Sequence, residues 1–171
     1  MDLKSESSPR IIFVTGGPGT GKGTQCPLLA EEFGYSHISI GDLMRAELKS
    51  QSVQGKLIQE IVQSGNLVPK ELTVELLMKA LRNTKAHTVL VDGFLRSVDQ
   101  AVYLEQTGMK VDFLLHFDTD REDILLNRLI ERGKTSGRAD DNEETITNRF
   151  MVYKAESMPV LNLYEPFGIV R

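Results

Sequence analysis

The amino-acid sequence predicts an α/β fold in which a parallel β-sheet is covered by helices on both faces. Apolar segments rich in β-branched or aromatic residues lie at residues 11–14, 37–40, 88–91 and 113–117. Their nearly continuous hydrophobicity is typical of parallel strands that are buried on both faces. Because segments with helical spacing lie between them, strands and helices alternate, and we expect right-handed crossover connections.

The helices are predicted from apolar residues that recur on one helical face. They span residues 22–33, 71–83, 120–132 and about 142–164, and Pro159 is expected to kink the last of them.

The connection between the second and third strands is unusually long. About three short helices are expected within it, and Ser39 to Asp42 resembles a capping box that begins the first. The segment at residues 64–71 contains Gly and Pro and should end the second helix. A second irregular segment is predicted at residues 133–144, which are polar and rich in glycine, as a mobile lid would be.

Length and composition indicate one globular domain. The chain has 171 residues, a net charge of −4 and a pI near 5.4. This balance argues against a general nucleic-acid or membrane-surface binder. The single cysteine excludes an internal disulfide and fits a reducing compartment such as the cytoplasm. We expect residues 1–10 to form a flexible tail and residues 11–171 to form the domain.

A phosphate-binding loop is the strongest functional signal. In "IIFVTGGPGTGKGTQ", Gly16 and Gly21 precede Lys22 with P-loop spacing, after an apolar strand and before a helix. Glycines let the backbone point several N–H groups at one anion, and the helix N-terminus adds partial positive charge. The motif calls for Ser or Thr after the lysine, but Gly23 stands there, so we expect Mg²⁺ to be held mainly by phosphate oxygens and water.

Asp92 follows the third predicted strand and is the natural acid to reach that metal through bound water. The alternative is that Asp92 only caps a strand-to-helix turn. The histidines lack metal-ligand spacing, and Cys26 is expected to pack within a helix.

Several arginines indicate a second anion site. Arg128 and Arg132 lie four residues apart on one predicted helix, where their like charges repel. An anion held between them and Arg138 and Arg149 would relieve this repulsion. The alternative is surface pairing with the acidic residues that follow, Asp140, Asp141, Glu143 and Glu144. Direct phosphoryl transfer needs only positioning and charge stabilisation, without a covalent intermediate.

Further motifs occur in a consistent order, namely "GDLMR", "SGNLVP", "DGFLR", "RLIERGKTSGR" and "DDNEETI". With them the chain resembles the adenylate kinases, within the nucleoside monophosphate kinases, over nearly its whole length after the first ten residues. The resemblance implies a P-loop NTPase-type sheet of strand order 2-3-1-4-5, with the last strand missing or truncated. It also implies an insertion at about 39–70 that binds the monophosphate, and a short lid at about 133–141.

The implied reaction is the Mg²⁺-dependent, reversible conversion of ATP and AMP into two ADP, by a monomer in the cytoplasm. The resemblance assigns charge stabilisation during transfer to Lys22, Arg96, Arg132, Arg138 and Arg149. It assigns ATP binding to Gly17, Gly19, Thr20, Gly21, Lys22, Gly23, Thr24 and Arg128. It assigns AMP binding to Ile40, Arg45, Asn66, Val68, Gly93, Arg96, Gln100, Arg138 and Arg149.

Two alternatives remain open at this point. UMP/CMP kinases share the pattern but carry Asn where this chain has Gln100. A catalytically weak module that binds or senses adenine nucleotides would share it as well. The chain also departs from the family at Ile40, where Thr is usual, and at Leu95, where Pro is usual. We expect a trans peptide bond before Leu95 and a shifted loop, because a cis bond before leucine costs about 2.5–4 kcal/mol.

Overall fold

A computed structural model of the protein describes residues 9–50, 52–138 and 140–171. Its sheet contains β1 (Arg10–Gly16), β2 (Ser36–Ser39), β3 (Thr88–Asp92) and β4 (Leu114–Phe117). The strands are parallel and lie in the order β2-β3-β1-β4. The strand order predicted for these four positions is therefore confirmed. The expected N-terminal tail lies mostly outside the described residues, and Arg10 already belongs to β1.

The last residues of the chain take the fifth position in the sheet. Val170 forms a parallel bridge with Leu114 of β4. The Leu114 N–H donates to the Ile169 carbonyl at 3.0 Å, and the His116 N–H donates to the Arg171 carbonyl at 2.8 Å. This short pairing occupies the place that the resemblance gives to the fifth strand.

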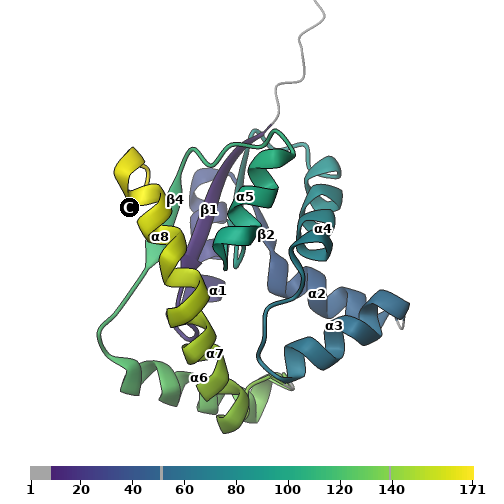
Figure 1. The fold of residues 1–171 in the computed structure, drawn as a ribbon, viewed down its shortest axis with the longest axis vertical. Helices are drawn as coiled ribbons and strands as arrows, with labels where there is room; N and C mark the ends of the chain where they lie inside the picture. The colour runs from purple at the N-terminus through teal and green to yellow at the C-terminus, as the bar shows by residue number, and fades with distance from the viewer. Residues whose placement is uncertain (1–8, 51, 139) are drawn as a thin grey trace, which may run out of the picture.

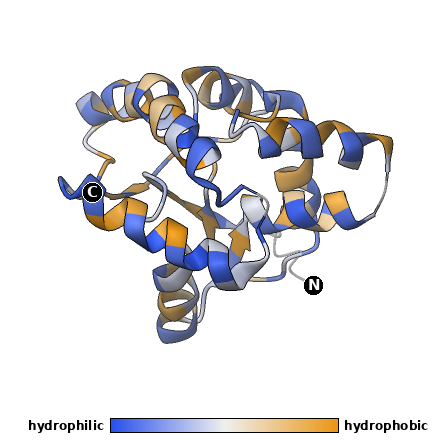
Figure 2. Ribbon diagram, turned by 90° about the horizontal axis from the view of Figure 1, so that it is seen from below, coloured by the Kyte–Doolittle hydropathy of each residue, from blue (hydrophilic) through white to orange (hydrophobic). Residues whose placement is uncertain are grey.

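Helices cover both faces of the sheet (Figure 1). On one face, α1 (Lys22–Phe33) packs Cys26 and Ala30 against Val14 and Leu90. The larger core lies on the other face, where α4 (Lys70–Arg82), α5 (Val98–Gln106) and α8 (Met158–Tyr164) pack on the sheet. Hydrophilic and hydrophobic residues alternate along the helices in Figure 2, as expected for helices with one buried face.

In the described part of the long connection between β2 and β3, three helices are present, as predicted. They are α2 (Ile40–Lys49), α3 (Val53–Gln63) and α4. Ser39 caps α2, because its hydroxyl accepts a hydrogen bond from the Asp42 N–H at 3.3 Å. The segment after Gln63 ends α3, also as predicted.

Three predictions about helices need correction. The helix α5 was not predicted, although Ser97 caps it through the Gln100 N–H. The helix α6 (Glu122–Ser136) is longer than predicted, so residues 133–136 are helical and not irregular. Gly133 lies within this extension and lets the chain approach closely, because a Cβ atom there would lie 2.4 Å from the Asp141 carbonyl oxygen.

The last predicted helix has the expected limits but is interrupted. It divides into α7 (Glu143–Val152), a π-helical turn (Tyr153–Ser157) and α8. The Met158 N–H donates to the Tyr153 carbonyl five residues earlier. Pro159 has no N–H to continue an α-helical ladder, and this wider turn accommodates the missing donor. In the part of the chain that the structure describes, no helix is both long enough and apolar enough to cross a membrane.

Candidate active site

The predicted phosphate loop connects β1 to α1 at the carboxyl end of the sheet. Gly19 has φ +81°, and a Cβ atom there would lie 2.9 Å from the Leu125 carbonyl oxygen of α6. Gly21, the N-cap of α1, has φ +96° but no neighbouring atom within 4 Å of a built Cβ. Both positions favour glycine through backbone conformation, and Gly19 also requires it for packing.

Lys22 folds back over this loop. Its ammonium donates to the Gly17 carbonyl at 2.8 Å and to the Thr20 hydroxyl at 3.2 Å. It also donates to the Gly16 carbonyl. Burial lowers the pKa of Lys22 to about 8, against the opposing effect of Asp92 and with a further lowering by nearby arginines. Among the described residues no carboxylate forms an ion pair with this ammonium, and a cation in this state favours a bound phosphate.

Asp92 ends β3 beside the phosphate loop. The residue is 7% exposed, and its Oδ1 atom has no hydrogen-bond partner among the described residues. Its negative charge raises the pKa of Lys22, so the two groups act on each other across the loop. A buried carboxylate oxygen without a partner suits a hydrated divalent cation. Asp92 therefore fits the Mg²⁺ that a nucleoside triphosphate carries.

Arg96 is held by its own loop. Its Nε atom donates to the Gly93 carbonyl at 2.6 Å, and its backbone N–H donates to Gln100 Oε1 at 2.9 Å. The Ser157 hydroxyl donates to the Arg96 carbonyl at 2.8 Å. Burial, followed by the positive charge of Arg149, lowers the pKa of the Arg96 guanidinium. Desolvated and close to another cation, Arg96 is well suited to an anionic ligand.

Leu95 gives this loop an unusual backbone. It is fully buried, and its φ of +56° is the only positive φ of a non-glycine residue in the described chain. The peptide bond before it is trans, which confirms that prediction. Leucine is rarely left-handed, and such a conformation costs on the order of 1–3 kcal/mol.

A buried carboxylate gathers the arginines of α6 and α7. Arg132 donates two hydrogen bonds to Asp141, at 2.6 and 2.7 Å. Arg149 lies 3.0 Å from the same carboxylate and 2.9 Å from that of Asp140. The alternative of acidic pairing, which the sequence left open, therefore holds for these two arginines in the structure. Burial opposes ionisation of Asp141, but Arg132 and the neighbouring arginines outweigh it and hold the pKa of Asp141 below its usual value.

The remaining predicted arginines lie at the edge of this group. Burial lowers the pKa of Arg138, and the positive charges of Arg45 and Arg132 lower it further. Arg45 itself pairs with Asp42 on α2. Arg128 lies on the exposed surface of α6, one turn before Arg132.

A cavity of about 640 Å³ lies beside the Arg96 loop. It is lined by the 66–71 segment, the start of α5, and residues of the π turn and α8. Three predicted AMP-binding residues line it, namely Asn66, Val68 and Gln100. A cavity of this size is typical of small-molecule sites. Ile40 packs in the hydrophobic core instead, and its predicted place in the AMP site stays a prediction.

The end of α3 is joined to α7. The Thr145 hydroxyl donates to the Gln63 carbonyl at 2.9 Å, and the Asn148 amide donates to the Ser64 carbonyl at 2.6 Å. The Asn148 amide also reaches the Asn66 side chain at 3.2 Å. These contacts connect the predicted monophosphate-binding insertion to the helix that carries Arg149.

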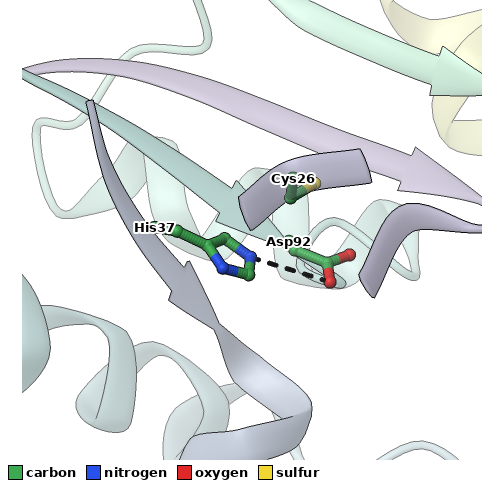
Figure 3. Close-up of side chains that lie close together, drawn as sticks. All are labelled: Cys26, His37 and Asp92. Carbon is green, nitrogen blue, oxygen red and sulfur yellow. Dashed lines mark ion pairs between the residues drawn. The ribbon is translucent and has the colours of Figure 1, made fainter. Parts of the chain in front are cut away.

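Sequence reasoning missed two features of this region. It treated Asp141 as one of several surface acids, whereas its side chain is fully buried. It also expected Cys26 to pack within a helix and found no metal-ligand spacing for His37, although both approach Asp92 in the fold (Figure 3). Spacing did not reveal Asp141, because its two arginines lie nine and eight residues away on two different helices. It did not reveal the second feature because Cys26, His37 and Asp92 are far apart in the sequence.

The chain resembles known proteins over nearly all of its length. A family model described as adenylate kinase matches residues 14–169. Uridylate kinase of Saccharomyces cerevisiae is 49% identical over 159 residues, which is 91% of this chain and 78% of that protein. The UMP-CMP kinase of Lentinula edodes is 47% identical, over 96% of this chain and 78% of that protein.

The chain is similar to adenylate kinases to nearly the same degree. Adenylate kinase isoenzyme 1 of Bos taurus is 44% identical over 164 residues, which is 95% of this chain and 84% of that protein. The chain therefore belongs to the adenylate kinase family and is a nucleoside monophosphate kinase.

Proposed function

We propose that the chain catalyses the reversible, Mg²⁺-dependent transfer of a phosphoryl group from ATP to AMP. The single observation that carries the choice of AMP is Gln100, which lines the cavity and adjoins Arg96. The donor phosphates would occupy the loop around Lys22, and the acceptor phosphate would reach Arg96.

The residues of the site stabilise charge and do not form bonds to the phosphoryl group. The acceptor phosphate is largely dianionic at neutral pH, because its second pKa is about 6, and it needs no general base. Lys22, Arg96, Arg132, Arg138 and Arg149 would neutralise the charge on the phosphates during in-line transfer. Asp92 would hold Mg²⁺ through water, and the metal would supply positive charge at the phosphate oxygens.

Closure of the site would exclude water, so that AMP and not solvent accepts the phosphoryl group. We assign this closure to two segments, the insertion at about 39–70 and the lid at about 133–141, whose irregular part begins after Ser136. The α3–α7 contacts support this assignment, because they link the insertion to Arg149. Action as a monomer in the cytoplasm stays a prediction.

Recognition of the base depends on the Gln100 amide. Its Oε1 atom already accepts from the Arg96 N–H, so its NH₂ group can donate to a ligand in the cavity. Adenine offers a ring nitrogen as acceptor and an exocyclic amine as donor, which together match both ends of an amide.

UMP or CMP is the second candidate acceptor. It is favoured by the similarity to the Saccharomyces cerevisiae uridylate kinase and the Lentinula edodes UMP-CMP kinase. A pyrimidine carbonyl could also accept from the Gln100 NH₂ group, so this residue discriminates by geometry and not by donor type.

A coupled assay of ADP formation would separate the candidates. We expect kcat/KM to be highest with AMP when AMP, UMP, CMP and GMP are compared at saturating ATP and Mg²⁺. A higher value with UMP or CMP would contradict the proposed acceptor. Binding of nucleotides without turnover would instead support a sensing module.

Gln100→Asn tests the residue itself. We expect the preference for AMP over UMP to fall by on the order of tenfold, because the shorter amide no longer reaches both adenine groups. Gln106→Asn is the matched control, since Gln106 lies on the exposed end of the same helix. Equal preferences in the two variants would remove Gln100 from base recognition.

A further inference from the structure

Three side chains from three elements converge beside the phosphate loop (Figure 3). They are Cys26 on α1, His37 on β2 and Asp92 on β3. One ligand atom from each lies within 4.8 Å of the other two. Cys26 is fully buried and Asp92 is 7% exposed, so the cluster lies inside the molecule.

The polar atoms of this cluster are not satisfied by one another. His37 Nε2 and Asp92 Oδ1 are buried without a hydrogen-bond partner among the described residues. The His37 Nε2–Asp92 Oδ2 distance is 3.9 Å, which is too long for a hydrogen bond. Unpaired polar atoms are costly to bury, so atoms of this kind indicate a missing ligand.

The donor set determines which ligand fits. Sulfur, imidazole nitrogen and carboxylate oxygen are the ligands that Zn²⁺ takes, at about 2.0–2.3 Å in tetrahedral geometry. Such bond lengths place neighbouring ligand atoms roughly 3.3–3.8 Å apart. The three ligand atoms lie within 4.8 Å of one another, so small side-chain movements would bring them onto one ion. Mg²⁺ prefers an all-oxygen shell and does not suit a thiol.

We propose that Cys26, His37 and Asp92 bind a thiophilic divalent cation, with Zn²⁺ as the best fit and water in the fourth position. Binding forms a bond from the metal to the Cys26 sulfur, and the thiol proton leaves to solvent. Burial and the charge of Asp92 raise the pKa of Cys26 to about 12, against a smaller opposing effect of Lys22. The thiol is therefore protonated, and unreactive as a nucleophile, until a metal displaces the proton.

A consequence follows for catalysis, and it rests on the proposed function. Asp92 is the acid assigned to the hydrated Mg²⁺, and a Zn²⁺ ion bound to its carboxylate would neutralise the charge that attracts the Mg²⁺ water shell. A cation bound at the cluster would also lie close to Lys22, which interacts with both Asp92 and Cys26. We therefore expect Zn²⁺ at this site to inhibit phosphoryl transfer.

Titration of the full chain with Co²⁺, a spectroscopic substitute for Zn²⁺, tests the binding site directly. Cys26 is the only cysteine, so a thiolate-to-cobalt charge-transfer band can arise from no other residue. We expect this band to saturate at one equivalent and to disappear when Zn²⁺ is added. Absence of the band in the wild-type chain would overturn the proposal.

Variants assign the other ligands. Cys26→Ser should abolish the band, and His37→Gln should weaken Co²⁺ binding by at least about tenfold. His87→Gln is the matched control, because His87 is exposed and precedes β3 outside the cluster. Circular dichroism of each variant checks folding, and Cys26→Ala serves if Cys26→Ser is unfolded. Equal binding by His37→Gln and His87→Gln would remove His37 from the site.

Inhibition is measured separately, at saturating Mg²⁺. Zn²⁺ should reduce the turnover of the wild type, and Cys26→Ser should resist it. Equal inhibition of both would overturn the inhibitory role. A cobalt band in a chain without kinase activity would support the metal site and contradict the proposed function. Normal turnover without a band would support the proposed function and contradict the metal site.

Discussion

The phosphate loop and the arginine group on α6 and α7 are built in different ways. The loop is shaped by its own backbone, and Lys22 donates to groups within residues 16–20. The arginine group is assembled by charge pairs across elements, because Asp141 holds Arg132 and Arg149 together. One half of the site is thus encoded over a few adjacent residues, and the other half exists only in the folded chain.

This difference has a consequence for ligand binding. An anion at the loop meets backbone N–H groups and a helix N-terminus that are already in place. An anion at the arginine group must compete with the carboxylates of Asp140 and Asp141 for the guanidinium groups. The loop is therefore preorganised, whereas a phosphate bound at the arginine group, as we propose, would have to displace these carboxylates.

Lys22→Met, in the preorganised loop, should produce the largest effect. Turnover should fall by on the order of a thousandfold, because the charge on the transferring phosphates loses its central cation. Lys134→Met is the control, since Lys134 is an exposed lysine on α6. Turnover within a few-fold of wild type would refute the assignment of Lys22.

The same variant should be more stable than the wild type at pH 7. The folded-state pKa of Lys22 is about 8, below its ordinary 10.5, so the folded chain binds fewer protons than the unfolded chain between these values. Wild-type stability therefore rises with pH over this window. We expect Lys22→Met to gain on the order of 1–3 kcal/mol in urea unfolding at pH 7, and this gain to shrink towards pH 10.

Asp141→Asn tests the half of the site that depends on charge pairs. Two arginines lose their shared carboxylate, and the free energy of unfolding should fall by on the order of 2–3 kcal/mol. Turnover should fall by on the order of tenfold, because the arginines are no longer held in place. Asp123→Asn, which breaks an exposed pair with Arg121, should have little effect on either quantity.

The pH dependence of stability gives a further readout for this variant. The pKa of Asp141 lies below its usual value in the folded chain, so its contribution is complete above the unfolded value of roughly 3.9 and is lost as the pH falls below it. Asp141→Asn should lack this part of the acid-induced loss. An acid unfolding curve parallel to that of the wild type would contradict the role of Asp141.

Leu95→Pro tests whether the loop that carries Arg96 is already in the position that phosphoryl transfer needs. Proline fixes φ near −65°, so it cannot adopt the +56° that Leu95 has in a fully buried position. If the loop has been displaced from the family's arrangement, AMP turnover should rise by up to on the order of tenfold as Arg96 moves. Unchanged or lower turnover would mean that Arg96 is already well placed.

Two glycine variants should change the free energy of unfolding by the smallest amounts. Together they separate the cost of backbone strain from the cost of packing inside the phosphate loop. Gly21→Ala should destabilise the chain by about 1–2 kcal/mol, the cost of a left-handed residue. Gly19→Ala should cost more, because its Cβ would also meet the Leu125 carbonyl. Equal unfolding free energies for the two variants would show that α6 shifts to make room for the added Cβ atom at little cost.

Local patterns in the sequence determined most of the fold and the phosphate half of the site. The strands, the capping of α2 by Ser39 and the phosphate loop depend on residues within a few positions of one another. Helix ends were harder to predict. The extension of α6 to Ser136 places Gly133 against the Asp141 carbonyl, a contact that joins two separate segments, and the π turn accommodates Pro159 within a packed helix.

Tertiary structure alone decided the partners of the charged and polar side chains. Nothing in the spacing of Cys26, His37 and Asp92 indicates that the crossing of α1, β2 and β3 brings them together. Nor does the sequence tell Asp141, which is buried between two arginines, from the exposed Glu143 and Glu144 beside it. Periodicity reports which face of an element is buried, whereas burial of a charge depends on which partner the fold places opposite it.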